Sequence, residues 1–216
     1  MTRYAMVADL RRCVGCQTCT AACKLTNATP PGVQWRKVLD VELGEYPNAE
    51  RVFMPVGCQH CSDPPCLDVC PSTATRKRDD GIVTIDYDIC IGCAYCAVAC
   101  PYQARFKVES RHLAYDKPMR NEEQRFDEGL LGVAQKCTFC VDRIDAGLAQ
   151  GLVPGVDPDA TPACANACIA NALTFGDIED PQSNVSQLLS NNAWFQMHEE
   201  LGTDPGFYYL WDKERT

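Results

Sequence analysis

"CVGCQTCTAAC", residues Cys13 to Cys23, places four cysteines at the spacing C-x2-C-x2-C-x3-C. Runs of this kind occur in iron–sulfur ligand loops, in zinc sites and in disulfide frameworks. Three further groups of four cysteines follow it, and the four groups account for all 16 cysteines of the 216-residue chain. The first group is Cys13, Cys16, Cys19 and Cys23; the second is Cys58, Cys61, Cys66 and Cys70; the third is Cys90, Cys93, Cys96 and Cys100; and the fourth is Cys137, Cys140, Cys164 and Cys168.

The four groups alternate in type along the chain. "ADLRRCVGCQTCTAAC" around the first group corresponds to "IDYDICIGCAYCAVAC" around the third. "CQHC" and "DPPCLDVC" of the second group correspond to "CTFC" and "TPACANAC" of the fourth, which carries an insertion between its two halves. Self-similarity in this order indicates a duplicated unit that carries two cysteine groups.

The spacing favours iron–sulfur clusters over zinc and over disulfides. Three cysteines at C-x2-C-x2-C wrap three corners of a [4Fe–4S] cube, and in the bacterial ferredoxin run the fourth cysteine binds the other cluster. Zinc ribbons require only two C-x2-C pairs a dozen or more residues apart, and disulfide scaffolds are usually short secreted chains. Pro71 and Pro101 complete the C-x3-C-P pattern in the second and third groups, whereas Lys24 and Ile169 take this place in the other two.

Composition excludes several kinds of partner. The net charge of −9 argues against nucleic acid or an anionic lipid surface. No run of about 18 apolar residues is present, so we expect no direct membrane span. The opening "MTRYAMVADLRRC" does not resemble a signal peptide, because Asp9 interrupts its apolar part.

Between the cysteines the sequence predicts short elements. The apolar segments 4–9 and 51–56 are typical of strands, and residues 73–86 predict a hairpin that turns at Asp80-Gly81. Residues 141–151 have helical periodicity and end in glycine. Most of the remaining chain is connection, so we expect little conventional core and a fold stabilised largely by what the cysteines bind.

Five other features allow two interpretations each. We expect His60 to be a solvated loop residue rather than a group near a cluster or quinone, and Lys24 to be a surface lysine rather than a cation that tunes a cluster. "RKRDD", residues 76–80, is a docking patch or a solvated hairpin tip. Residues 107–135 form a subunit contact or a surface loop. The aromatic tail "GFYYLW", which holds Phe207, Tyr208, Tyr209 and Trp211, packs on the domain or anchors a partner.

The sequence allows two pairings of the cysteine groups. Neighbouring pairing joins the first group to the second and the third to the fourth, as the repeat does. Nested pairing joins the second to the third and the first to the fourth. The short link from Cys70 to Cys90 makes residues 55–104 similar to a complete two-cluster bacterial ferredoxin. The local pattern favours nesting but leaves both pairings open.

Nearly the whole chain resembles the four-cluster iron–sulfur subunit of the dimethyl sulfoxide reductase family of molybdopterin enzymes, close to the polysulfide reductase type. The resemblance rests on "YAMVADLRRCVGCQTCTAACK", "HCSDPPCLDVCP", "CIGCAYCAVACPY", "KCTFC", "TPACANAC", "TFGDIEDPQS" and "ELGTDPGFYYL". It implies nested pairing and four [4Fe–4S] clusters with all sixteen cysteines as iron ligands. The four ligand sets so implied are Cys13, Cys16, Cys19 and Cys168; Cys137, Cys140, Cys164 and Cys23; Cys90, Cys93, Cys96 and Cys70; and Cys58, Cys61, Cys66 and Cys100.

The resemblance also implies a fold and a role. The fold is α+β and loop-rich, with two ferredoxin-like modules related by a pseudo-two-fold axis. One module comprises residues 1–54 and 105–180, the other comprises residues 55–104, and residues 181–216 form a C-terminal subunit-contact tail. The implied role is electron transfer, without catalysis of its own, between a molybdopterin-containing catalytic subunit and an integral membrane quinone-reactive subunit. The protein would be peripheral on the cytoplasmic membrane through a partner, and we favour the cytoplasmic side.

Two other functions remain open at the level of sequence. A free-standing soluble polyferredoxin would use the same clusters as a carrier for several partners, but it has no need of the long segment after Cys168. A zinc-stabilised interaction module would have no redox role and would be colourless. The sequence contains neither a P-loop nor a G-x-G-x-x-G before a helix, so no motif of this kind indicates a substrate or nucleotide site.

Overall fold

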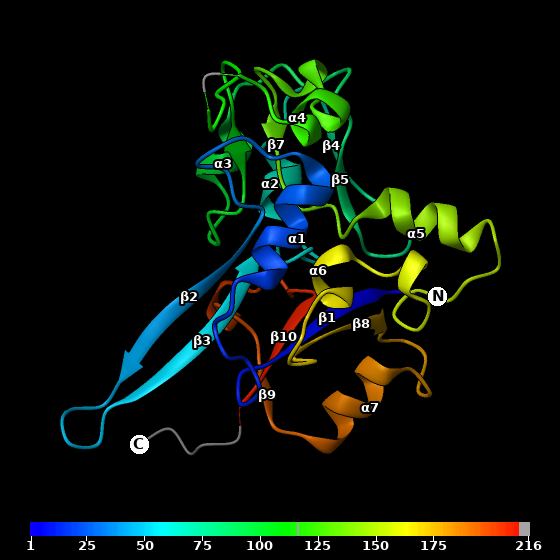
Figure 1. Cartoon of the computed structure of the whole chain (residues 1–216). Helices are drawn as coiled ribbons and strands as arrows, with labels where there is room; N and C mark the ends of the chain where they lie inside the picture. The colour runs from blue at the N-terminus through cyan, green and yellow to red at the C-terminus, as the bar shows by residue number, and fades with distance from the viewer. Residues whose placement is uncertain (116, 212–216) are drawn as a thin grey trace.

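A computed structural model describes residues 1–115 and 117–211 of the chain. A four-stranded sheet in the order β8-β1-β10-β9 lies at its centre (Figure 1). β1 (Tyr4–Asp9) pairs antiparallel with β8 (Leu173–Asp177) and parallel with β10 (Phe207–Leu210), so Met6 lies opposite Phe207. β9 (Trp194–Phe195) extends the sheet beside β10.

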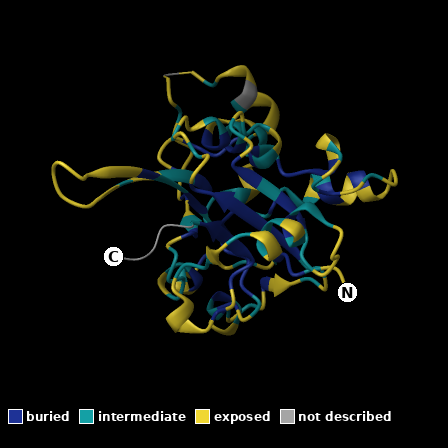
Figure 2. Cartoon of the chain, turned by 90° about the horizontal axis from the view of Figure 1, so that it is seen from below, coloured by how far each residue is buried: buried dark blue, intermediate teal, exposed yellow. Residues whose placement is uncertain are grey.

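The central sheet is buried on both faces. Ala5, Val7 and Leu210 pack on one side against α7 (Asn184–Asn191), and Met6, Phe207 and Tyr209 face the larger core on the other. Every residue of β1 is therefore buried, and Figure 2 shows the sheet as a dark blue centre. The expectation of little conventional core was wrong for this half of the molecule.

A long hairpin leaves the body of the protein beside the sheet. β2 (Arg36–Leu43) pairs in register with β3 (Glu50–Gly57), which confirms the predicted strand at 51–56. The hairpin is buried or half-buried over much of its length as far as Val52, which is 7% exposed, whereas its tip at residues 42–51 is exposed and includes Tyr46, which is 94% exposed. The tip of the hairpin projects from the body of the protein as an arm (Figures 1 and 2).

The cysteine-rich remainder is built from short elements. β4 (Thr75–Lys77) and β5 (Val83–Ile85) form the predicted hairpin at 73–86, and β6 (Phe106–Lys107) pairs with β7 (Ala134–Gln135). The helices are α1 (Thr18–Asn27), α2 (Pro65–Asp68), α3 (Tyr95–Val98), α4 (Arg120–Arg125), α5 (Val141–Leu148) and α6 (Ala163–Asn166), with 3-10 turns at Glu128–Leu130, Pro158–Ala160 and Glu199–Leu201. α5 confirms the predicted helix at 141–151, although its last turn is not α-helical.

The C-terminal segment belongs to the fold. Residues 181–216 were predicted as a subunit-contact tail, yet α7, β9 and β10 all lie in this range and β10 is buried within the sheet. Phe207, Tyr208 and Tyr209 therefore pack on the domain, and Trp211 packs at the edge of the same core. Residues 212–216 of the tail lie outside the described residues.

Candidate cofactor sites

The first cysteine loop and the end of α6 enclose one cavity. Cys13 and Cys16 lie in the loop before α1 and Cys19 lies in its first turn, while Cys168 follows α6. These four thiols, called quartet I, line a cavity that is partly open to solvent. Val38 and Pro55 at the base of the β2–β3 arm close its side.

Two further quartets lie around α2 and α3. Quartet III consists of Cys58, Cys61, Cys66 and Cys100, which line one cavity, and quartet IV consists of Cys70, Cys90, Cys93 and Cys96, which line another. Each draws three thiols from one loop-and-helix segment and the fourth from just beyond the other helix. The segments around α2 and α3 therefore exchange their last cysteines.

Quartet II consists of Cys23, Cys137, Cys140 and Cys164. Cys23 is buried on α1, and α1 packs against α6, which carries Cys164. Burial raises the pKa of the Cys23 thiol, and the neighbouring Cys137, Cys164 and Cys140 groups raise it further. The structure thus brings together four quartets with the memberships that nested pairing requires.

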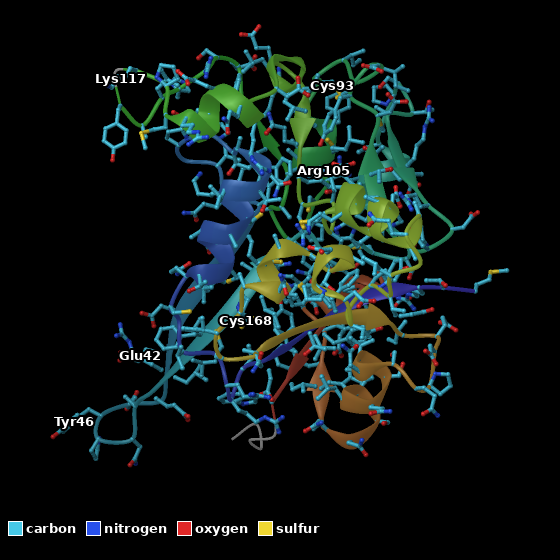
Figure 3. All side chains as sticks on the ribbon, turned by 45° about the vertical axis from the view of Figure 1, so that its right-hand side comes forward. Glu42, Tyr46, Cys93, Arg105, Lys117 and Cys168 are labelled. Atoms are coloured by element: carbon cyan, nitrogen blue, oxygen red, sulfur yellow. The ribbon has the colours of Figure 1, made fainter. Side chains whose placement is uncertain are left out.

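The four quartets follow one another in a line. Cys19 of quartet I is an electrostatic neighbour of Cys164 in quartet II, and Cys137 of quartet II is a neighbour of Cys58 in quartet III. α2 and α3, which carry Cys66 and Cys96, join quartet III to quartet IV. In Figure 3, Cys93 of quartet IV lies near the top of the molecule and Cys168 of quartet I lies well below it.

The two ends of this line are open to the surface. Of the sixteen cysteines, all within the described residues, Cys16 and Cys93 are exposed, and they belong to quartets I and IV. Apolar side chains surround both: Val14 and Ile169 are 60% and 71% exposed near quartet I, and Val98 is 87% exposed on α3 beside quartet IV. Exposed apolar groups gathered at one place are typical of an interaction surface.

The lining of the quartets suits an anionic, multi-atom cofactor. Burial raises the pKa of the Cys137 thiol to about 11 and that of Cys140 to about 12, so their thiolates need a compensating positive charge. Buried nitrogen donors of Arg36 and Arg105 have no hydrogen-bond partner in the described chain. Buried donors are rarely left unpaired, and sulfide or thiolate acceptors would satisfy them.

The thiols do not converge on a single point. Four thiolates around one zinc ion would be about 3.8 Å apart, given a Zn–S distance of about 2.3 Å. Within residues 1–115 and 117–211, no three Cys, His, Asp or Glu side chains are placed to hold one metal ion. The residues present fit a cluster of several iron atoms better than a single ion.

A repeated turn follows the last cysteine of three groups. The carbonyl oxygens of Cys70, Cys100 and Cys168 each accept a hydrogen bond from the amide three residues later, and that residue has positive φ in each case. In the fourth group the same turn forms with Ile169 in place of proline. Backbone amides of Thr75 and Ala172 then approach the Sγ atoms of Cys70 and Cys168, at 3.4 and 3.3 Å. Proline is therefore not required for this turn.

Glycine is required in two of the loops. Gly15 and Gly92 occupy equivalent places before α1 and α3, with φ of +68° and +65°. A side chain at Gly15 would overlap the Phe53 ring, and one at Gly92 would overlap the Gly132 carbonyl oxygen. Both the left-handed backbone and the crowding exclude larger residues.

The expectation of a solvated His60 was wrong. His60 is 2% exposed, its ring stacks on Phe139 with centroids 3.7 Å apart, and its Nδ1 accepts a hydrogen bond from the Val83 amide. Burial lowers the pKa of His60 well below its usual value, and nearby cationic side chains lower it further. The residue is a neutral imidazole within the core, because its loop folds beneath β5.

Lys24 and the hairpin tip at residues 76–80 are also more tightly held by the protein than solvated surface groups would be. Lys24 is half-buried, and its Nζ donates to the carbonyl oxygens of Thr29, Pro30 and Val33 at 2.9–3.0 Å, so it fixes the loop after α1. At the hairpin tip, Arg78 forms a bidentate ion pair with Asp145 of α5. The tip is held against the body of the protein.

Sequence reasoning missed three buried cations: Arg36 and Lys136, both 0% exposed, and Arg105, 6% exposed. Arg105 Nη2 donates to Cys66 Sγ at 2.9 Å. Lys136 directly precedes Cys137. Lysine and arginine are common on surfaces, so their sequence positions give no sign of burial.

Comparisons with known proteins agree with these observations. The family described as "4Fe-4S dicluster domain" matches residues 49–178. The chain is 42% identical to the putative iron–sulfur subunit of a dimethyl sulfoxide reductase from Halobacterium salinarum, covering 97% of this chain and 79% of that protein. It is 39% identical to a subunit of the selenate reductase of Mesobacillus selenatarsenatis and 40% identical to a subunit of the tetrathionate reductase of Salmonella typhimurium, covering 96% of this chain and 72% of each relative.

Proposed function

Because the chain belongs to the iron–sulfur subunits of the dimethyl sulfoxide reductase family of molybdopterin oxidoreductases, we propose that it relays single electrons within such a complex. Each quartet would hold one [4Fe–4S] cluster, with its four thiolates as iron ligands. The clusters supply one-electron redox chemistry. The protein positions them and supplies hydrogen bonds to ligands such as Cys66 and Cys70.

The observation that carries this proposal is the line of quartets with one exposed thiol at each end. A relay between two partners requires an entry and an exit, and Cys16 and Cys93 provide them at quartets I and IV. Interior thiols such as Cys137 and Cys164 are buried, which suits intermediate steps. A free-standing carrier serving one partner at a time would need only one such end.

We assign the quartet I end to the molybdopterin catalytic subunit. Val38 and Pro55 of the arm line quartet I, so the arm projects from this end and offers Tyr46 and Leu43 to a partner. The two-stranded tip at residues 42–51 is exposed, and an isolated two-stranded hairpin is only marginally stable in water, which favours an arm that packs on another subunit.

We assign the quartet IV end to a membrane quinone-reactive subunit. Ile91, Tyr95 and Val98 are 68%, 63% and 87% exposed around Cys93. No helix in the described residues has the length and apolar character needed to cross a bilayer. Attachment to the cytoplasmic membrane would therefore run through the partner, on the side that we predict to be cytoplasmic. Residues 107–135, which include α4, remain a predicted subunit contact.

The two-module organisation is part of the proposal. Quartets III and IV use only cysteines from residues 55–104, and quartets I and II use only cysteines outside this range. This division supports a module at 55–104 and a second at 1–54 with 105–180. We assign the sixteen thiols to iron binding and assign no catalytic residue to the chain.

Co-purification from the native membrane tests the proposal. Anaerobic isolation through a tag on this chain should recover a molybdenum-containing subunit and a membrane subunit in fixed ratio, and quinol should reduce the clusters in the isolated complex. Recovery of the chain alone, with clusters that exchange electrons freely with added soluble proteins, would favour the polyferredoxin alternative instead.

A further inference from the structure

Three buried cations lie among the quartets without a carboxylate partner. Arg36, Lys136 and Arg105 are 0%, 0% and 6% exposed, and within the described chain none of them forms an ion pair with Asp or Glu. A buried charge is costly unless an opposite charge or several hydrogen bonds compensate it. Their compensation must come from other anionic groups.

Arg36 lies at the junction of quartets I and II. Burial lowers the pKa of Arg36, but thiolates of Cys164, Cys137 and Cys23 outweigh this effect and raise it. The same guanidinium lowers the raised pKa of Cys19 in quartet I. Its Nη2 approaches the Met6 sulfur and its plane covers the Phe207 ring, while Nε and Nη1 have no partner among the described residues.

Lys136 lies at the junction of quartets II and III. Its Nζ donates to the carbonyl oxygen of Cys137, a member of quartet II, at 2.7 Å, and to that of Val83. Val83 lines the quartet III cavity; burial raises the pKa of Cys66, and Lys136 is one of the cations that oppose this rise. The ammonium group therefore faces both neighbouring quartets.

Arg105 lies at the junction of quartets III and IV. Its Nη2 donates to Cys66 Sγ at 2.9 Å and its Nη1 to Thr75 Oγ1 at 3.1 Å. Thr75 lines the quartet IV cavity, and Cys96 of quartet IV is among the thiolates that raise the pKa of Arg105 against the lowering effect of burial. Figure 3 shows Arg105 below Cys93, in the interior of the molecule.

We propose that Arg36, Lys136 and Arg105 are fixed cations, one at each junction between neighbouring clusters. Each cation raises the reduction potentials of the two clusters on either side of it. Reduction adds one negative charge to a cluster. A buried cation stabilises the reduced form more than the oxidised form, and the low dielectric of the interior strengthens this effect.

Potentiometric titration followed by EPR tests this inference, which rests on the proposed function because it needs clusters in the quartets. Arg105→Gln should lower the midpoint potentials of clusters III and IV, Lys136→Met those of II and III, and Arg36→Gln those of I and II. We expect each of these midpoint potentials to fall by at least about 59 mV, which corresponds to a tenfold change in the equilibrium constant for one-electron reduction. Arg51→Gln is the matched control, because Arg51 is exposed on the arm and paired with Asp40. It should shift all potentials much less.

Charge-retaining variants decide the outcome if a neutral variant loses clusters. Retention of iron in Arg105→Lys and Arg36→Lys, with loss in the neutral variants, supports a requirement for positive charge. Loss in both kinds of variant means that the side chains only fill space and overturns the inference. Unchanged potentials in neutral variants that keep their iron also overturn it. A wild-type protein without any cluster signal would refute the proposed function itself.

Discussion

Cys19 and Cys23 lie one turn apart on α1, yet their thiols belong to different quartets. Cys19 lines the cavity shared with Cys168, whereas Cys23 lies beside Cys137, Cys140 and Cys164. Residues four apart share a helix face, so a helix that runs between two cofactors can serve both of them. α1 thereby ties the two ends of the chain into one unit.

Removal of single thiols should therefore affect different clusters. Cys19→Ala and Cys168→Ala should both abolish or degrade the signal of cluster I and leave cluster II, while Cys23→Ala should do the reverse. EPR of the reduced proteins measures this directly. If Cys168→Ala instead matched a quartet IV variant such as Cys96→Ala, as neighbouring pairing requires, nested pairing would be wrong.

The projecting arm should be needed for assembly and not for cluster binding. Replacing residues 42–51 by Asn-Gly joins Val41 to Val52, which pair across the hairpin, through a two-residue turn. We expect normal iron content and at least about a tenfold loss of affinity for the catalytic subunit, since exposed aromatic residues such as Tyr46 often dominate interfaces. Pull-down with the catalytic subunit provides the measurement, and undiminished recovery would exclude this role for the arm.

The two apolar ends should bind different partners. Val98→Asp should weaken attachment to the membrane subunit about tenfold or more, and Ile169→Asp should weaken binding of the catalytic subunit. In each variant the new carboxylate would be buried in the subunit interface without a partner. Val156→Asp is the control, since Val156 is 72% exposed but lines none of the cysteine cavities. Membrane flotation and pull-down separate the two effects. Equal losses in all three variants would point to general destabilisation.

The sequence predicted the local elements better than the long-range framework. Strands at 4–9 and 51–56, the 73–86 hairpin and the helix at 141–151 follow from short-range periodicity and turn residues, and the structure confirms them. The membership of the quartets came from resemblance, because spacing alone left two pairings open. No local pattern indicates that β1 pairs in parallel with β10 at the other end of the chain.

Burial of polar residues was the other limit of sequence reasoning. His60 and Arg105 lie in loops whose composition is typical of surfaces, yet both are buried. Their burial depends on partners from distant segments, namely Phe139 and the Val83 amide for His60 and Cys66 for Arg105. Such contacts are set by tertiary structure, which neither propensity nor spacing describes.

Removal of iron should unfold the molecule unevenly. The core around β4 and β5 contains Cys66 and Cys96 among its few buried members, whereas the core beneath β1 and α7 contains no cysteine. We expect amides of 58–104 to lose hydrogen-exchange protection soon after oxidative cluster loss, while those of β1 and β8 persist longer. Hydrogen exchange followed by mass spectrometry tests this order. Simultaneous loss in both regions would show that the sheet also depends on the clusters.

Metal and sulfide analysis of the anaerobically purified protein, combined with EPR during reductive titration, tests the central claim most directly. Four [4Fe–4S] clusters predict about sixteen iron atoms and about sixteen acid-labile sulfides per chain. They also predict four cluster signals that appear as the potential is lowered. Zinc without sulfide, or iron sufficient for only two clusters in a fully folded chain, would contradict a relay that runs through all four quartets.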